Sequence, residues 1–148
     1  MLYFELDMAP ISWSAPKLSR RNTYNPRSKE KKNTISELRW RMSALRGPIK
    51  GFVVLDLEFI FTIPKSASKR QIQRMLGEIP GEELYPTKKD CTNMQKFIED
   101  CLKNVAFEDD RYVVNVRSRK RYGQVEKGKI LINVYSIEEY KEIQGTCA

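Results

Sequence analysis

The stretch KKDCTNMQKFIEDCLKNVAFEDDRYVVNVRSRK, residues 88–120, decides the fold. Between residues 92 and 105 its apolar side chains recur three and four positions apart, which is typical of the buried side of an amphipathic helix. They are Met94, Phe97, Ile98, Cys101, Leu102 and Val105. Residues 111–119 alternate polar and apolar side chains, as a half-buried strand does. The stretch therefore predicts a helix that is followed directly by a strand.

The sequence on either side predicts further strands and helices. Alternation predicts strands over residues 2–7, 51–63 and 129–135, and apolar spacing with capping residues predicts helices over 34–46, 65–77 and 136–141. We expect the strand at 129–135 to form a hairpin with the one at 111–119, through a turn that contains Gly123 and Gly128. This order predicts one α+β domain over residues 1–148, with a mixed or antiparallel sheet packed against helices.

The net charge of the chain is strongly positive. There are 27 Lys and Arg residues against 19 Asp and Glu, which gives a formal charge of +8. Residues 11–33 are polar, contain Pro16 and Pro26, include Arg20 and Arg21, and predict a basic loop. A basic protein most often binds an acidic polymer such as nucleic acid. The alternative is a surface that is basic without a specific partner.

Several classes of site are excluded because the sequence has no histidine. A Ser-His-Asp triad, a Cys-His dyad and every histidine-bearing metal site are impossible, so acid–base chemistry must come from carboxylates, lysines, tyrosines or metal-bound water. The three cysteines form no CxxC pair and predict packing roles rather than a zinc site. The sequence has neither a membrane-length apolar run nor a signal-peptide pattern, and we expect a cytoplasmic protein with no membrane partner.

The acidic residues around the predicted helix suggest a metal site. Thr92 and Gln95 have the spacing of a capping box, so we expect Thr92 to be the N-cap and Asp90 to lie just outside the helix. Asp109 and Asp110 precede the next strand, and if that strand pairs beside the helix start they can approach Asp90. Clustered carboxylates need a proton or a cation between them, and oxygen ligands suit Mg²⁺ or Mn²⁺.

Basic residues lie on both sides of these acids. They are Lys88 and Lys89 before the helix and Arg117, Arg119, Lys120 and Arg121 in the strand. Acids that hold a divalent ion inside a basic ring would attract a phosphate backbone and could cleave it. The plainer alternatives are a solvated strand end for residues 117–121, an ordinary turn for Asp109 and Asp110, and a solvated helix face for Lys96. Trp13 and Trp40 could stack on bases, but burial is the commoner role of aromatic residues.

The run DCTNMQK at residues 90–96, followed by Asp100 and by Asp109-Asp110, resembles the signature of the RusA-type Holliday junction resolvases. In that family an Asp-x-Asp-Asn-x-x-Lys motif opens a helix, an Asp follows one turn after the Lys, and an Asp-Asp pair follows the helix. The flanking stretches YPTKK (85–89), RKRY (119–122) and NTYNP (22–26) are also similar to the family. The resemblance implies a small homodimeric α+β nuclease, bacterial or prophage-encoded, which uses Mg²⁺ to make paired nicks in four-way DNA junctions.

The resemblance also implies roles for individual residues. Asp90 would be the first metal carboxylate and Asp110 another, with Asp109 as a further ligand. Lys96 would stabilise charge on the scissile phosphate or position water. Thr92 and Asn93 would organise the helix start. The residues expected to contact DNA are Lys88, Lys89, Arg117, Arg119, Lys120, Arg20 and Arg21.

One position departs from the family pattern. Thr92 stands where the family has its second motif acid, and a hydroxyl is a poor, uncharged metal ligand. Either the site binds one ion with fewer charges, or Asp109, Glu99 or Asp100 supplies the missing ligand. The sequence therefore leaves two functions open, a metal-dependent endonuclease for branched DNA and a junction-binding protein whose cleavage is weak or lost. A general RNA-binding domain is a third alternative, but its sequence signatures are missing.

Overall fold

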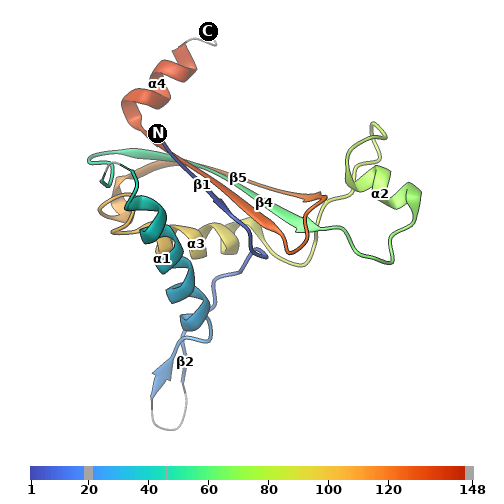
Figure 1. Ribbon diagram of the computed structural model, residues 1–148, viewed down its shortest axis with the longest axis horizontal. Helices are drawn as coiled ribbons and strands as arrows, with labels where there is room; N and C mark the ends of the chain where they lie inside the picture. The colour runs from blue at the N-terminus through green and yellow to red at the C-terminus, as the bar shows by residue number, and fades with distance from the viewer. Residues whose placement is uncertain (19–21, 46, 146–148) are drawn as a thin grey trace.

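The computed structural model describes residues 1–18, 22–45 and 47–145 (Figure 1). The strands are β1 (Leu2–Leu6), β2 (Lys17–Leu18), β3 (Thr23–Tyr24), β4 (Val53–Thr62), β5 (Val113–Gly123) and β6 (Lys129–Ser136). The helices are α1 (Ser28–Met42), α2 (Lys69–Met75), α3 (Cys91–Leu102) and α4 (Ile137–Gly145), with a 3₁₀ turn at Asp110–Tyr112. The predicted α+β fold is confirmed.

Four strands form one mixed sheet in the order β1-β6-β4-β5. β6 pairs antiparallel with both β1 and β4, whereas β4 and β5 run parallel. The predicted hairpin between β5 and β6 is therefore wrong, because β4 lies between them. β4 takes this central place because its apolar run buries side chains on both faces of the sheet, including Val54 and Ile60 on the face away from the helices.

The hydrophobic core lies between the sheet and two helices, α1 and α3, which cover the same face (Figure 1). From α3 it receives the predicted apolar stripe, since Met94, Phe97, Ile98, Cys101 and Leu102 are all buried. From the sheet it receives Phe4, Leu55, Leu57, Phe59, Ile130, Ile132 and Val134, together with Leu38 from α1. This packing fixes the direction of α3 across the sheet, and with it the position of both helix ends.

The segment predicted as a basic loop, residues 11–33, contains regular structure. The short strands β2 and β3 pair within it, and α1 begins at Ser28, six residues before the predicted start of the helix. The first turns of α1 are charged and solvated, and the buried residues of this helix are Thr34 and Leu38. A helical turn without apolar residues has no hydrophobic period, so the sequence pattern could not reveal it. Arg20 and Arg21 lie outside the described residues.

Two further elements lie away from the core. α2 projects beyond one end of the sheet and begins with a capping box formed by Ser68 and Gln71 (Figure 1). α4 follows β6, and Ser136 Oγ accepts a hydrogen bond from the backbone N–H of Glu139 in its first turn. Among the described residues, no helix has the length and apolar character needed to cross a membrane.

Candidate functional site

The start of α3 differs from the predicted capping arrangement. Asp90, not Thr92, is the N-cap, and its side chain makes no capping hydrogen bond. Thr92 is exposed in the first turn, while Gln95 accepts a hydrogen bond from Ser118 Oγ at 2.8 Å and donates to Glu99 at 3.1 Å. The Gln95 side chain thus hydrogen-bonds to β5 and to the next turn of α3 and not to the N-cap residue. A local sequence pattern could not predict the contact with β5. The Asp90 carboxylate is left exposed at the positive end of the helix, where it accepts one long hydrogen bond of 3.5 Å from Asn93 Nδ2.

The chain that follows β1 lies against this helix start. The backbone N–H of Trp13 donates to the carbonyl of Asn93 at 2.9 Å, and Lys96 Nζ lies 3.4 Å from the centroid of the Trp13 ring. Lys89 Nζ donates to the carbonyl of Pro10. These contacts bring residues 10–13 and 89–96 together although they lie more than 70 positions apart in the sequence.

The end of β5 meets the same region. Lys120 Nζ donates to the carbonyl of Lys89 at 2.8 Å. Burial lowers the pKa of Lys89, and the nearby charge of Arg27 lowers it further. Lys88 and Lys96 are exposed next to these groups. The segments that meet at the start of α3 therefore carry four lysines and one exposed carboxylate, with the amino groups of Lys89 and Lys120 on backbone carbonyls and that of Lys96 on the Trp13 ring.

Asp109 and Asp110 lie at the opposite end of α3. β5 runs antiparallel to the helix, since Ser118 contacts Gln95 and Lys120, further along the strand, contacts Lys89 before the helix. The start of the strand therefore adjoins the end of the helix. The charges that act most strongly on Asp110 belong to Lys103, Asp100 and Asp109. Asp90 and Asp100 are separated by ten residues, or about 15 Å along a helix axis. The expectation that the strand start approaches Asp90 within one chain is therefore wrong.

The acids at the far end of α3 influence one another. Burial raises the pKa of Glu99, and the charges of Asp110 and Asp100 add to this, against a hydrogen bond from Gln95. Burial also raises the pKa of Asp110, whereas a backbone hydrogen bond from Arg111 lowers the pKa of Asp109. Asp100 lies 4.0 Å from Lys31 of α1. None of these groups is placed to replace the missing acid at Thr92 of the same chain.

The described residues of one chain do not assemble a metal site. No three carboxylate or thiol side chains in this part of the chain converge so as to hold an ion. Burial raises the pKa of the Cys101 thiol to about 12, which keeps the thiol neutral and agrees with the packing role expected for it. A divalent ion at Asp90 would need further oxygen ligands from outside this set.

The arginines of β5 are partly neutralised. Arg119 pairs with Glu58 at 3.2 Å and lies 3.6 Å from Asp56, and Arg121 pairs with Glu58 as well. Arg117 occupies the same face of the strand and is exposed. This is the face of the sheet away from α3, because the alternate residues Ser118 and Lys120 are the ones that contact Gln95 and Lys89. The acids of β4 thus compete with a phosphate backbone for Arg119, and the lysines, not these arginines, are the cations on the side of α3.

Sequence reasoning missed several residues of this region. Arg27 influences Lys89 from the start of α1, Trp13 contacts Lys96, and Asp56 and Glu58 pair with the arginines. All of these are contacts between distant segments, so neither spacing nor periodicity could indicate them. The expected burial of Trp40 is wrong, since its side chain is 73% exposed on α1.

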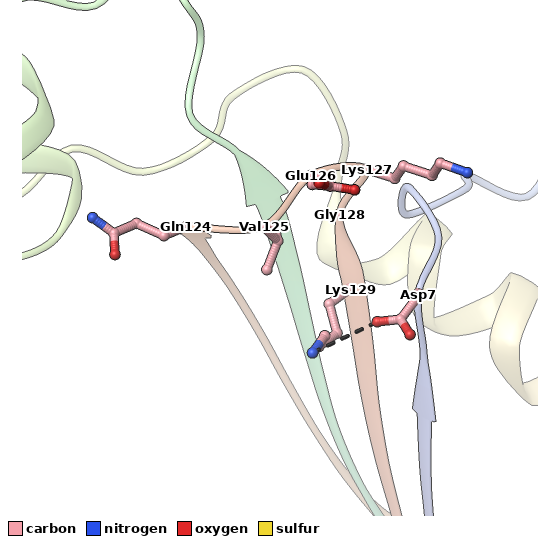
Figure 2. A pocket seen from close by; sticks show the side chains of 7 residues that line it. All are labelled: Asp7, Gln124, Val125, Glu126, Lys127, Gly128 and Lys129. Atoms are coloured by element: carbon pink, nitrogen blue, oxygen red, sulfur yellow. Dashed lines mark ion pairs between the residues drawn. The ribbon is translucent and has the colours of Figure 1, made fainter.

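A pocket lies outside this region, at the turn between β5 and β6 (Figure 2). Its lining includes Asp7 and residues 124–129, and Lys129 forms an ion pair with Asp7 at 3.6 Å. None of the predicted site residues lines it. The pocket therefore gives no reason to move the candidate site away from the start of α3.

Comparison with known proteins agrees with the sequence motif. The family model described as Endodeoxyribonuclease RusA matches residues 7–135 of the 148-residue chain, a range that follows β1 and contains β4, β5, β6 except its last residue, and all of α1, α2 and α3. None of the curated proteins compared with the chain matches it. The family match extends over far more than half of the sequence and includes the start of α3 with Asp90 and Lys96. The chain therefore belongs to the RusA family of endodeoxyribonucleases.

Proposed function

We propose that this protein is a structure-specific endonuclease that resolves four-way DNA junctions by paired nicks, with Mg²⁺ or Mn²⁺ as cofactor, in DNA recombination and repair. The observation that carries the proposal is the start of α3, where the exposed Asp90 carboxylate lies at the positive end of the helix and the segments that meet there carry Lys88, Lys89, Lys96 and Lys120. Lysines gathered in one region attract a phosphodiester, and an exposed carboxylate in the same region offers oxygen ligands to a divalent cation.

The residues at the helix start have separable roles in this proposal. Asp90 would hold the ion, and Lys96 would stabilise the negative charge that develops on the scissile phosphate. The half-buried amino groups of Lys89 and Lys120 are held by backbone carbonyls and would fix the DNA backbone in register. Lys88, which is exposed beside Asp90, would add attraction that does not depend on sequence, and Arg117 would add to it from the opposite face of the sheet.

A homodimer is part of the proposal for two reasons. Paired nicks in a junction of near two-fold symmetry need two matched sites. In addition, Asp110 lies near the opposite end of α3 from Asp90 of the same chain. Both can therefore be ligands of one ion only if a second subunit brings its own Asp110 to Asp90. The site would still have one carboxylate fewer than the family pattern, because Thr92 stands in place of the second motif acid.

The test is cleavage of a labelled four-way junction with Mg²⁺ or Mn²⁺. We expect the wild type to cut opposed strands, Asp90→Asn to lose cleavage while retaining junction binding, and Asp7→Asn, an exposed acid beside β6, to behave as the wild type. Binding without cleavage under both metals would contradict the enzyme. Full activity of Asp90→Asn would instead contradict the site, and equal affinity for linear duplex would contradict the preference for junctions.

A second function, junction binding without efficient cleavage, is favoured by one observation. Thr92 is exposed in the first turn of α3 beside Asp90, where a carboxylate would be well placed to share an ion. If this alternative holds, the wild type binds junctions and cuts them slowly, and Thr92→Asp raises the rate. An unchanged or lower rate in Thr92→Asp, with a fully active wild type, would remove the alternative.

A further inference from the structure

We propose that Trp13 is a positioning residue for Lys96, and that its indole ring holds the lysine ammonium group at the start of α3. The inference rests on the proposed function, because it gives Lys96 a reason to be held in one place. Trp13 lies in the segment that follows β1, far in the sequence from the motif that contains Lys96.

The contact between the two side chains is close. Lys96 Nζ lies 3.4 Å from the centroid of the Trp13 ring, well inside the distance at which a cation is attracted to an aromatic face. An indole attracts a cation better than a phenol or phenyl ring does. An uncharged ring also leaves the full positive charge of the lysine in place, whereas a carboxylate partner would neutralise it before a phosphate arrived.

The ring itself is held from two directions. The backbone N–H of Trp13 donates to the carbonyl of Asn93 at 2.9 Å, and the half-buried side chain packs against the hydrophobic core. Three residues earlier, the carbonyl of Pro10 accepts from Lys89 Nζ, which ties the same segment to the residue before Asp90. The indole is therefore a fixed surface and not a second mobile side chain.

Lys96 needs such a surface because it is exposed on a helix. A lysine has four rotatable bonds and a strongly hydrated head group, so a solvated one samples many rotamers. Charge stabilisation in a transition state depends on a donor that is in place before the reaction. A ring that favours one lysine conformation therefore raises the rate without changing how tightly DNA is bound.

The first measurement is the NMR signal of the Lys96 side chain, assigned by its loss in Lys96→Arg. We expect the ring current of Trp13 to shift the Hε protons upfield in the wild type. The shift should disappear in Trp13→Leu, remain in part in Trp13→Phe, and be unchanged in Trp40→Leu, which removes the only other tryptophan from an exposed site. Hε protons at the position of a solvated lysine in the wild type would overturn the proposal.

The second measurement is single-turnover cleavage of a four-way junction at saturating protein. We expect Trp13→Leu to cut about two- to fivefold more slowly, as for the loss of an exposed cation–π contact, with unchanged junction affinity. Trp13→Phe should cut at a rate between those of Trp13→Leu and the wild type, and the control Trp40→Leu should cut at the wild-type rate. A wild-type rate in a folded Trp13→Leu would overturn the positioning role. If the wild type cuts no junction, the proposed function fails and the positioning role falls with it, whatever the NMR signal shows.

Discussion

At the scale of single residues, the two ends of α3 differ in charge and in solvation. At its start, an exposed carboxylate shares a region with lysines, three of whose amino groups are held by carbonyl oxygens or an indole ring. At its end, burial raises the pKa of Glu99 and of Asp110, and the charge of Asp100 raises both further. The acids that cluster are thus at the opposite end of the helix from the acid that lies near the lysines, and this separation governs what each substitution should do.

Glu99→Gln should stabilise the protein at neutral pH. Burial raises the pKa of Glu99 above its ordinary value of 4.5, so the folded state binds the proton more tightly than the unfolded state does. Stability therefore falls as the pH rises from 4.5 through the raised pKa, and the penalty is complete above the raised pKa. Because the side chain is half-exposed, the gain should stay below about 1 kcal/mol.

The measurement is urea unfolding of wild type and Glu99→Gln at pH 7 and at pH 4. The difference in unfolding free energy should shrink at the lower pH, because the penalty is lost as the carboxyl becomes protonated in both states. Glu108→Gln, an exposed acid in the segment after α3, is the matched control. A variant that is less stable than the wild type at pH 7 would contradict this account of the acidic end.

At the scale of elements, α3 was the easiest to predict and its cap was the hardest. The apolar stripe predicts the helix because burial of one side imposes its period on the sequence. The N-cap at Asp90, the early start of α1 and the place of β4 between β5 and β6 depend on contacts between distant segments, which leave no local pattern. For the same reason the motif predicted that Asp90 and Lys96 lie together. It could not indicate that Trp13 contacts Lys96, or that Asp110 lies far from Asp90.

Loss of a stripe residue of α3 should be costly. Phe97→Ala removes a ring that is 2% exposed and packs between helix and sheet. We expect the free energy of unfolding to fall by about 3–5 kcal/mol, the usual cost of a large-to-small change in a core. Thr92→Ala, on the exposed side of the same helix, should change the free energy of unfolding by less than about 0.5 kcal/mol. Similar losses in both variants would contradict the assignment of the buried side.

The turn from β5 to β6 depends on a glycine. Gly128 has φ +114, and a Cβ there would lie 2.9 Å from the Ala9 Cα and 3.1 Å from the Met8 carbonyl oxygen. Gly128→Ala should therefore destabilise the protein by about 3 kcal/mol, from backbone strain and from the clash together. Gly81→Ala is the matched control, because Gly81 also has a positive φ but has open space at its Cβ position. Equal melting temperatures of the two variants would argue against close packing at this turn.

At the scale of the whole molecule, the proposed dimer can be tested by complementation. Asp90→Asn and Asp110→Asn should each be inactive as purified proteins. If a site takes Asp90 from one subunit and Asp110 from the other, a mixed dimer has one site with both acids and one with neither. Mixing the two variants under subunit exchange should then restore nicking of one strand, to at most about a quarter of the wild-type rate if subunits pair at random.

Sedimentation of the mixture at micromolar concentration confirms whether dimers are present at all. Asp90→Asn mixed with the double variant Asp90→Asn/Asp110→Asn is the control, since no pairing of these chains gives a complete site. Restored activity in the control would contradict the shared site. Dimers that exchange subunits without any recovery in the test mixture would contradict it as well.

The pairing of β1 with β6 has a consequence for the order in which the protein can be made. β6 hydrogen-bonds to both β1 and β4, so a nascent chain that has emerged only as far as residue 128 holds β1 without a neighbour in the sheet. Contacts of such long sequence separation form late and slowly. β1 can therefore join the sheet only after β6 has left the ribosome, and a chain that ends before residue 129 has no partner strand for β1.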